Sequence, residues 1–286
     1  MWMIFSEMQV FILITNLMSR LGFMILLLMS IGFHSYAQDN NIHFKEIPLR
    51  NARLLSADPT GNVYVATRNE LILINRADTV FKRFSNLSLG TLSTLDASNS
   101  MKALLYYRDQ AKIQFLDNTA SELSGPISLH SFGLEQAMLA CISFDNGFWV
   151  WLPSSFSLHR FNQQAQSVIN IKNIQQLTGL DQFNPITMRE RNNMLYLSDP
   201  ESGIQVFDVF GGYVKKIPIA GIEHFRVLDE RLLFQKDNSL FSYHLLLHTI
   251  DTLQFPTSNP IDFDVSSKKL YLLFPDMLRI YSLGDK

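Results

Sequence analysis

The chain has 286 residues, of which 47% are aliphatic, aromatic or cysteine and 17% are charged, and its formal net charge is −2. A chain this rich in apolar residues can bury most of its surface, so the composition excludes an intrinsically disordered protein. The sequence has no run of Lys or Arg. A nucleic-acid-binding protein needs such a basic surface to displace counterions, so we expect no nucleic-acid partner.

The N-terminal segment is typical of a secretion signal. Arg20 precedes an uncharged, mainly apolar run over residues 21–33, and Ser35 and Ala37 are small residues three and one positions before a cut after Ala37. We therefore predict a signal peptide over residues 1–37 and export to the periplasm or another part of the cell envelope. The residue after the cut is glutamine rather than the cysteine that lipid attachment needs, so we expect no lipidation.

Two alternatives for this segment stay open. Residues 1–17 add a second apolar stretch that contains Glu7, and translation from Met18 would make that stretch an extension of the gene model. An uncleaved membrane anchor is the other alternative, because roughly 20 apolar residues can span a bilayer.

After residue 37 the chain repeats one short strand motif six times. A second apolar strand precedes each copy across a short turn, and polar turns such as Asp145-Asn146-Gly147 stand before that strand, which is typical of hairpins. Further strands flank each pair, so each unit is predicted to have four antiparallel strands. The copies, each beginning with Leu or Ile and carrying a large apolar residue three positions later, are 71–75, 113–117, 158–162, 204–208, 240–244 and 278–282.

Repeats of about 40 residues with four strands each predict an all-β fold, a six-bladed β-propeller that occupies residues 38–286 as one domain. The last blade lacks an outer strand, because few residues follow the sixth copy. Residues 44–49 resemble 214–219, the predicted outer strand of the fourth blade. We therefore predict that the N-terminal strand pairs with the C-terminal blade and closes the ring, which removes an exposed sheet edge. Five and seven blades are the alternatives, although six accounts for every repeat.

One blade carries a recognisable repeat element. Residues 58–67, Asp-Pro-Thr-Gly-Asn followed by Val-Tyr-Val-Ala-Thr, resemble the D-x-x-G-N-hydrophobic strand element of NHL-type repeats and of sensor-type regulator propellers. Residues 145–150 are similar to it more loosely. The resemblance covers the chain as architecture and one or two blades as motif. It implies a fold and a habit of binding at one face, and no specific activity.

No motif specifies a reaction, a cofactor or a metal. The sequence contains no phosphate-binding glycine loop, no H-E-x-x-H, no paired C-x-x-C and no G-x-S-x-G. Cys141 lies in an apolar stretch, so we interpret it as a small buried hydrophobe. His244 and His248 have a metal-binding spacing for a helix but lie on a predicted strand and turn. We expect neither a cofactor nor a metal.

The repeat alignment places every turn between the second and third strands on one face of the propeller. Arg68, Arg108, Glu201 and Lys236 lie in or beside these turns and are candidates for contact with a partner. Loops on a rigid scaffold often carry binding residues. A mixed-charge surface that keeps the protein soluble is the alternative interpretation.

Glu223, His224 and Asp262 form a second candidate group, at the mouth of the central channel where the inner strands of the fifth and sixth blades begin. Our first hypothesis is a non-enzymatic binding or scaffolding module with a protein partner in the cell envelope, attached to an outer-membrane assembly or secretion machine. Membrane contact is then expected only through the signal segment or a membrane-protein partner. The alternative is a hydrolase, lactonase-like or glycan-cleaving, that uses these channel-mouth residues. Because they come from two adjacent blades only, we favour binding.

Overall fold

The computed structural model describes residues 44–237, 239–253 and 259–283. The chain divides into two units, Met1–Ile42 and His43–Lys286, and the fold below is that of the second unit. Among the described residues, no helix combines the length and the apolarity that crossing a membrane requires. The predicted signal segment lies outside the described residues.

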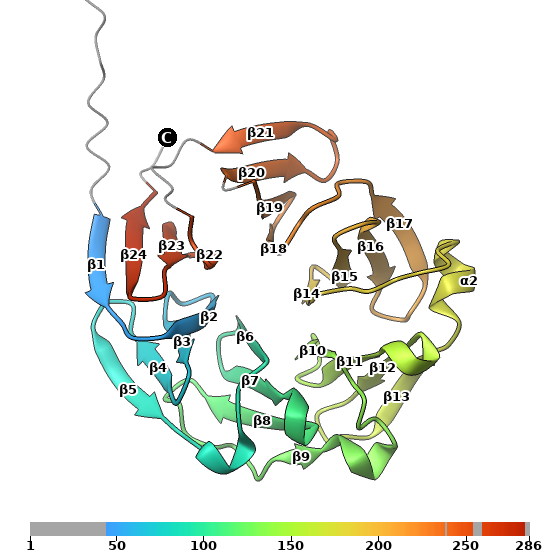
Figure 1. Cartoon of the computed structure of the whole chain (residues 1–286), viewed down its shortest axis with the longest axis horizontal. Helices are drawn as coiled ribbons and strands as arrows, with labels where there is room; N and C mark the ends of the chain where they lie inside the picture. The colour runs from blue at the N-terminus through green and yellow to red at the C-terminus, as the bar shows by residue number, and fades with distance from the viewer. Residues whose placement is uncertain (1–43, 238, 254–258, 284–286) are drawn as a thin grey trace, which may run out of the picture. The chain divides into compact units, whose positions relative to one another are not determined.

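The described strands form six four-stranded antiparallel sheets, arranged as the blades of a wheel (Figure 1). Blade 1 contains β2 (Ala52–Ala57), β3 (Val63–Thr67), β4 (Leu71–Ile74) and β5 (Val80–Phe84). Blade 2 contains β6 (Thr94–Asn99), β7 (Lys102–Tyr107), β8 (Lys112–Asp117) and β9 (Ile127–Ser128). Blade 3 contains β10 (Leu139–Ile142), β11 (Phe148–Leu152), β12 (Ser157–Phe161) and β13 (Ser167–Ile171). Blade 4 contains β14 (Thr187–Arg191), β15 (Met194–Asp199), β16 (Gly203–Asp208) and β17 (Tyr213–Ile217).

Blade 5 contains β18 (His224–Leu228), β19 (Arg231–Lys236), β20 (Ser239–His244) and β21 (Ile250–Leu253). Blade 6 contains β22 (Asp262–Ser266), β23 (Lys269–Leu273), β24 (Met277–Ser282) and β1 (Phe44–Pro48). Short helices lie in the connections: η1 (Leu87–Leu89), η2 (Arg108–Gln110), η3 (Leu129–Phe132), η4 (Pro153–Ser155) and α2 (Ile174–Thr178). The six-bladed all-β architecture predicted from the repeats is thereby confirmed.

The ring closes through the first strand, as the sequence predicts. β1 pairs antiparallel with β24, with Phe44 opposite Tyr281 and Pro48 opposite Met277, so the N-terminal strand is the outer strand of the C-terminal blade. The rings of Phe44 and Tyr281 also pack, with centroids 5.3 Å apart. Ile47 is buried in a cluster that joins blade 6 to blade 1. Closure therefore depends on apolar packing as well as on strand hydrogen bonds.

Apolar clusters between neighbouring blades form the core. In β11, Phe148 and Val150 pack against blade 2, while Trp149 and Trp151 pack against blade 4. Side chains alternate between the two faces of a strand, and both faces of a blade are covered by neighbours, so β11 is a continuous apolar run. Cys141 lies fully buried in the same cluster as Trp149, which confirms its interpretation as a small core residue.

In blades 1 to 4, the polar residue that ends the repeated strand motif makes the turn to the outer strand. The Oδ1 atom of Asp117 accepts hydrogen bonds from the backbone N–H groups of Thr119 and Ser121, each at 2.8 Å. Such turns are typical of Asn and Asp, because their short side chains reach the backbone two residues on. The same arrangement recurs at Asn75, Asn162 and Asp208.

Gly147 closes the turn after Asp145 and Asn146 in a place where no side chain fits. A Cβ atom there would lie 1.9 Å from the carbonyl oxygen of Phe161 in the neighbouring strand. The glycine of this turn is therefore required by the close approach of β11 to β12.

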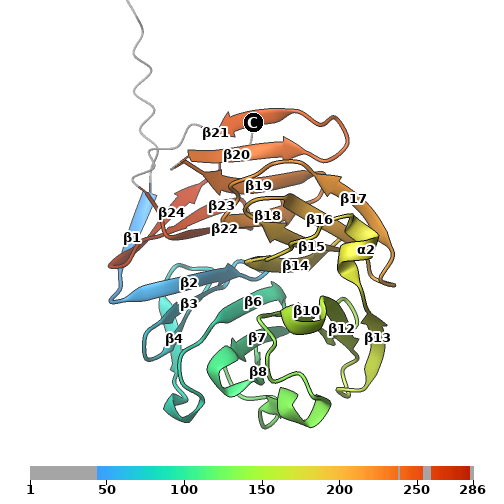
Figure 2. The same cartoon turned by 45° about the vertical axis from the view of Figure 1, so that its right-hand side comes forward.

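The two faces of the wheel differ in which turns they carry (Figure 2). Each blade runs from its inner strand to its outer strand, so all six inner strands start on one face. We call this the upper face; it also carries the turns between second and third strands, such as residues 68–70. The opposite, lower face carries the ends of the inner strands and the turns between first and second strands and between third and fourth strands, such as 58–62 and 75–79.

Candidate functional site

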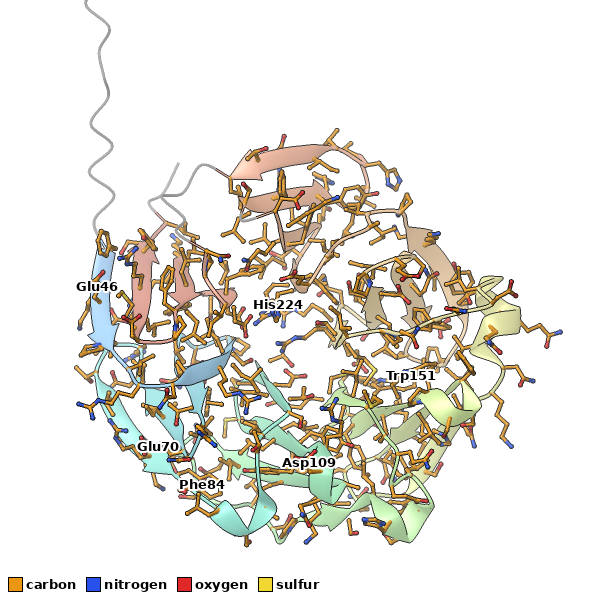
Figure 3. The ribbon with its side chains drawn as sticks, viewed as in Figure 1. Glu46, Glu70, Phe84, Asp109, Trp151 and His224 are labelled. Carbon is orange, nitrogen blue, oxygen red and sulfur yellow. The ribbon has the colours of Figure 1, made fainter. Side chains whose placement is uncertain are left out.

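The candidate partner-contact residues lie on the upper face but do not converge. Arg68, Arg108 and Glu201 are exposed in the turns between second and third strands of blades 1, 2 and 4, and Lys236 is half-buried at the end of β19 in blade 5. Figure 3 shows Glu70 and Asp109, from the first two of these turns, within their blades, and His224 near the axis. Among the described hydrogen bonds and ion pairs, none joins two of the four candidates.

The second candidate group lies at the upper mouth of the channel. His224 opens β18 and Asp262 opens β22, and the structure brings His224 Nδ1 to 3.7 Å from Asp262 Oδ1. Glu223 is exposed, and its backbone carbonyl accepts a hydrogen bond from Thr187 Oγ1 at 3.0 Å. A cavity of about 460 Å³ adjoins this mouth, lined by Ile186, Thr187, Pro200, Gly221, Glu223 and His224.

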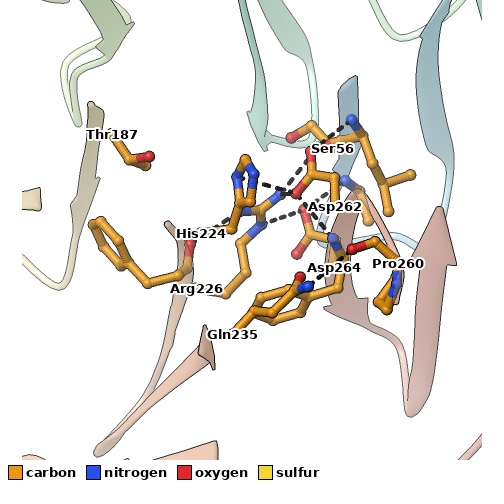
Figure 4. Close-up of polar contacts among 12 residues, drawn as sticks. Ser56, Thr187, His224, Arg226, Gln235, Pro260, Asp262 and Asp264 are labelled. Atoms are coloured by element: carbon orange, nitrogen blue, oxygen red, sulfur yellow. Dashed lines mark hydrogen bonds and ion pairs between the residues drawn. The ribbon is translucent and has the colours of Figure 1, made fainter. Parts of the chain in front are cut away.

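Asp262 is already bound on both carboxylate oxygens (Figure 4). Its Oδ1 atom accepts from Arg226 Nη2 at 3.1 Å and from the backbone N–H of Phe263 at 2.9 Å. Its Oδ2 atom accepts from the backbone N–H of Leu55, in blade 1, at 2.9 Å. The side chain is 4% exposed. These contacts fix the carboxylate between blades 5, 6 and 1.

Arg226 holds two carboxylates of the next blade. Its Nη2 atom bonds Asp262, and its Nε atom lies 3.0 Å from Asp264 Oδ2. Nη2 also donates to the carbonyl oxygen of Leu55 at 3.0 Å. Burial by itself lowers the pKa of Arg226, but the charges of Asp264 and Asp262 raise it above its ordinary value. The buried guanidinium therefore stays charged. We name Arg226, Asp262 and Asp264 the interblade clamp.

The clamp supplies hydrogen-bond acceptors to the unpaired edge of an inner strand. An inner strand has no neighbour on its channel side, so alternate N–H groups there need acceptors. Asp262 and Asp264, two residues apart on β22, accept from Leu55 and Ala57, two residues apart on β2, each at 2.9 Å. A carboxylate is a strong acceptor for a backbone donor. The charges at the axis thus join blade 6 to blade 1.

The same device continues around the wheel. Ser56 Oγ accepts from the N–H of Ala97 at 2.9 Å, which joins blade 1 to blade 2. Asp96 Oδ2 accepts from the N–H of Ile142 at 3.0 Å, which joins blade 2 to blade 3. Side chains of one inner strand therefore supply acceptors to the edge of the next over much of the ring.

Glu190 joins blade 4 to blade 3 in a different way. It is buried, and it accepts from Trp149 Nε1 at 2.5 Å, Ser143 Oγ at 2.8 Å and the N–H of Phe144 at 2.7 Å. Burial raises the pKa of the Glu190 carboxyl, although these three hydrogen bonds act in the opposite direction. The carboxyl is an internal bridge between the two blades.

A second cavity, of about 220 Å³, lies at the lower mouth. Its charged lining residues come from blades 1, 4, 5 and 6. They are Asp58, Arg189, Glu190, Arg191, Arg226 and Asp264. Within the described ranges, no group of three or more His, Cys, Asp or Glu side chains is arranged to hold a metal ion.

Sequence reasoning identified Asp262 and His224 but missed Arg226, Asp264 and the pair Arg189 and Arg191. A usable signal was present. Charged residues alternate with apolar residues in Asp-Phe-Asp-Val over 262–265, and three charged residues follow one another in Arg-Glu-Arg over 189–191. Their partners lie on other blades, so the pattern alone did not show what the charges do.

Comparisons with known proteins identify the fold. No family model matches the sequence, and no curated protein matches it. A streptogramin B lyase structure matches with a TM-score of 0.58 and 12% identity over 85% of this chain and 98% of that chain. A catalytically inactive virginiamycin B lyase from Staphylococcus aureus with quinupristin gives 0.55 and 12%, over 85% and 100%. The Pan2 WD40 domain from Neurospora crassa gives 0.53 and 10%, over 83% and 90%. At such identities the likeness shows the propeller fold alone, one that resembles virginiamycin B lyase.

Proposed function

We propose that this protein is an exported, non-enzymatic propeller with NHL-like blades that binds a protein partner in the cell envelope, as a scaffold of an outer-membrane assembly or secretion machine. The signal-like segment over residues 1–37 supports export. The interblade bonds of Asp262 and Glu190 support a binding role, because carboxylates held by several donors and buried in the ring are poorly placed for proton transfer.

The observation that carries the proposal is a set of exposed apolar side chains on the lower face. They belong to turns of four consecutive blades, 2 to 5, and each is more than half exposed. Large apolar patches on a protein surface commonly mark interaction sites. We name this set the lower apolar rim: Met101, Phe144, Phe210, Leu246 and Leu247.

Contacts between neighbouring turns join the rim across blades 2, 3 and 4. Lys102, next to Met101, donates to the carbonyl oxygen of Asn146 in the turn of Phe144. The guanidinium of Arg160 lies 4.8 Å from the ring centroid of Phe144 and donates to the carbonyl oxygen of Val209, the neighbour of Phe210. The turns of Met101, Phe144 and Phe210 therefore lie side by side and can contact one partner together.

Capture from native envelope extracts tests this function. Full-length tagged protein is expected to enrich a partner, and the double variant Phe210→Ser with Leu247→Ser is expected to lose it. Leu87→Ser is the matched control, because Leu87 is 73% exposed on the upper side of blade 1. Arg108→Ala tests the upper-face candidates in the same assay. A wild-type protein that enriches no partner, or a rim variant that enriches it as well as wild type, contradicts the proposal.

One observation supports the hydrolase alternative. His224 and Asp262 lie together at the upper mouth, beside the 460 Å³ cavity. If this pair acts on a lactone or a glycan, His224→Ala abolishes hydrolysis while the protein stays folded. Turnover that survives this substitution excludes the pair as the catalytic group.

A further inference from the structure

The lower mouth of the channel is a cavity whose acidic and basic residues differ in how many partners they have. Five blades contribute inner-strand ends or adjoining turns to the 220 Å³ cavity, among them Ser98 from blade 2 and Arg189 and Arg191 from blade 4. Three acidic and three basic side chains line it. Their formal charges cancel, so the partners of each group decide what the cavity can bind.

The acidic lining residues are all engaged inside the protein. Asp58 accepts from Thr60 and Asn62 within its own turn. Glu190 is bound by donors of blade 3, and Asp264 is held by Arg226 and by the N–H of Ala57. Each of these carboxylates accepts hydrogen bonds on both of its oxygens.

Two arginines of β14 have fewer hydrogen-bond and ion-pair partners than these acidic residues. Arg189 makes one contact, an ion pair of 3.4 Å from Nη1 to Asp96 Oδ1 across the channel. The side chain of Arg191 makes no hydrogen bond and no ion pair with any described residue, and its Nε atom is buried without an acceptor. A buried donor without an acceptor is unfavourable, so an acceptor that enters the cavity gains more here than at an exposed arginine.

The spacing of the two arginines places them on one side of the strand. Alternate residues of a strand point to the same face, so Arg189 and Arg191 share a face, while Glu190 between them points to blade 3. Ser98 adds a hydroxyl from blade 2 to the same cavity. The result is a pair of guanidinium groups with unused donors at the centre of the lower face.

We propose that the lower mouth is a carboxylate-binding site in which Arg189 and Arg191 receive an acidic side chain or the C-terminal carboxylate of the docked protein. A guanidinium group binds a planar carboxylate through two parallel hydrogen bonds. A guanidinium group also binds phosphate, so inorganic phosphate is the competing probe. A cavity of about 220 Å³ is large enough for a short acidic side chain.

The lower apolar rim surrounds this mouth on blades 2 to 5, so the segment that docks carries its acidic group next to apolar residues. This assignment rests on the proposed function for the identity of the occupant, because the rim and the mouth lie on the same face. The anion site itself can be tested without any partner.

Acetate is the probe. The full-length protein is titrated with acetate while NMR follows the arginine Nε–H signals, and saturable shifts of the Arg191 signal are expected. Arg191→Gln is expected to weaken acetate binding by about tenfold or more, because each charge-assisted hydrogen bond contributes on this scale. Arg53→Gln, at an exposed arginine near the start of β2, is the matched control and should leave acetate affinity unchanged.

Several outcomes overturn the site. They are the absence of saturable binding by the wild-type protein, acetate affinity in Arg191→Gln equal to that of wild type, and inorganic phosphate binding more tightly than acetate. Thermal unfolding checks that Arg191→Gln is folded, and Arg189→Gln provides a second variant on the same strand. Acetate binding without an enriched partner removes the proposed function and leaves the site, whereas partner capture without acetate binding does the reverse.

Discussion

Replacing Arg226 by Met tests the interblade clamp directly. Met has a similar length and fills much of the same space, but it leaves Asp262 and Asp264 buried without their cation. The side chain of Arg226 is 6% exposed and those of Asp262 and Asp264 are 4% and 8% exposed, so water cannot replace it well. Removing one partner of a buried ion pair costs about 3–5 kcal/mol, because it leaves an uncompensated charge.

The expected effect on thermal unfolding follows from the size of the domain. For domains of about 150–250 residues, each kcal/mol shifts Tm by roughly 2–4 °C, so Arg226→Met should lower Tm by roughly 6–20 °C. The assay is thermal unfolding followed by the fluorescence of Trp149 and Trp151, which are buried in blade 3.

Two further variants make the test specific. Arg231→Met removes an ion pair of the same blade, with Asp251, whose side chains are 49% and 61% exposed, and should cost about 0–1 kcal/mol. Adding Asp262→Asn and Asp264→Asn to Arg226→Met should recover part of the loss, because amide oxygens still accept from β2. If Arg226→Met lowers Tm no more than Arg231→Met does, the clamp is not the connection we describe.

Three other predictions follow from the fold and the buried titratable groups. Ile47→Ala should cost about 2–5 kcal/mol in urea unfolding, because Ile47 anchors the closing strand, whereas Lys45→Ala on the exposed face should cost less than about 0.5 kcal/mol. Burial raises the pKa of Glu190, so the folded protein binds more protons than the unfolded chain above pH 4.5; the free energy of unfolding should fall as pH rises from 4.5 through the raised pKa, and Glu190→Gln should flatten that segment. Burial lowers the pKa of Lys102 to about 8, against the charge of Asp145, so the unfolded chain binds more protons between about 8 and 10.5. The free energy of unfolding should rise over that range, and the same slope in Lys102→Met would contradict this assignment.

The strands could be predicted from the sequence because short-range sequence patterns determine them. The motif at 204–208 is apolar apart from Gln205 and ends at Asp208, and the side chain of Asp208 itself makes the turn that follows. The match between 44–49 and 214–219 predicted the pairing of β1 with β24 in the same way, because outer strands share a pattern. Turn chemistry and strand periodicity depend on residues close together in the chain, so they can be recognised in the sequence.

The candidate site was only partly accessible. The sequence placed His224 and Asp262 at one mouth, and the structure brings them within 3.7 Å. It gave no sign that Asp262 is bound by Leu55, 207 residues away, or that Arg226 lies between two carboxylates of the next blade. The upper-face candidates remain predictions.

The sequence by itself determined the number of blades, their strands and the closing partner of the last blade, because each depends on a pattern repeated within about 40 residues. Only the tertiary structure decided which charged side chains have hydrogen-bond partners inside the protein. Asp262 and Glu190 became internal bridges and Arg191 kept unused donors, because the inner strands of different blades converge at the axis. A charged side chain shows its role only when the groups within hydrogen-bonding distance are known, and here those groups come from distant parts of the chain.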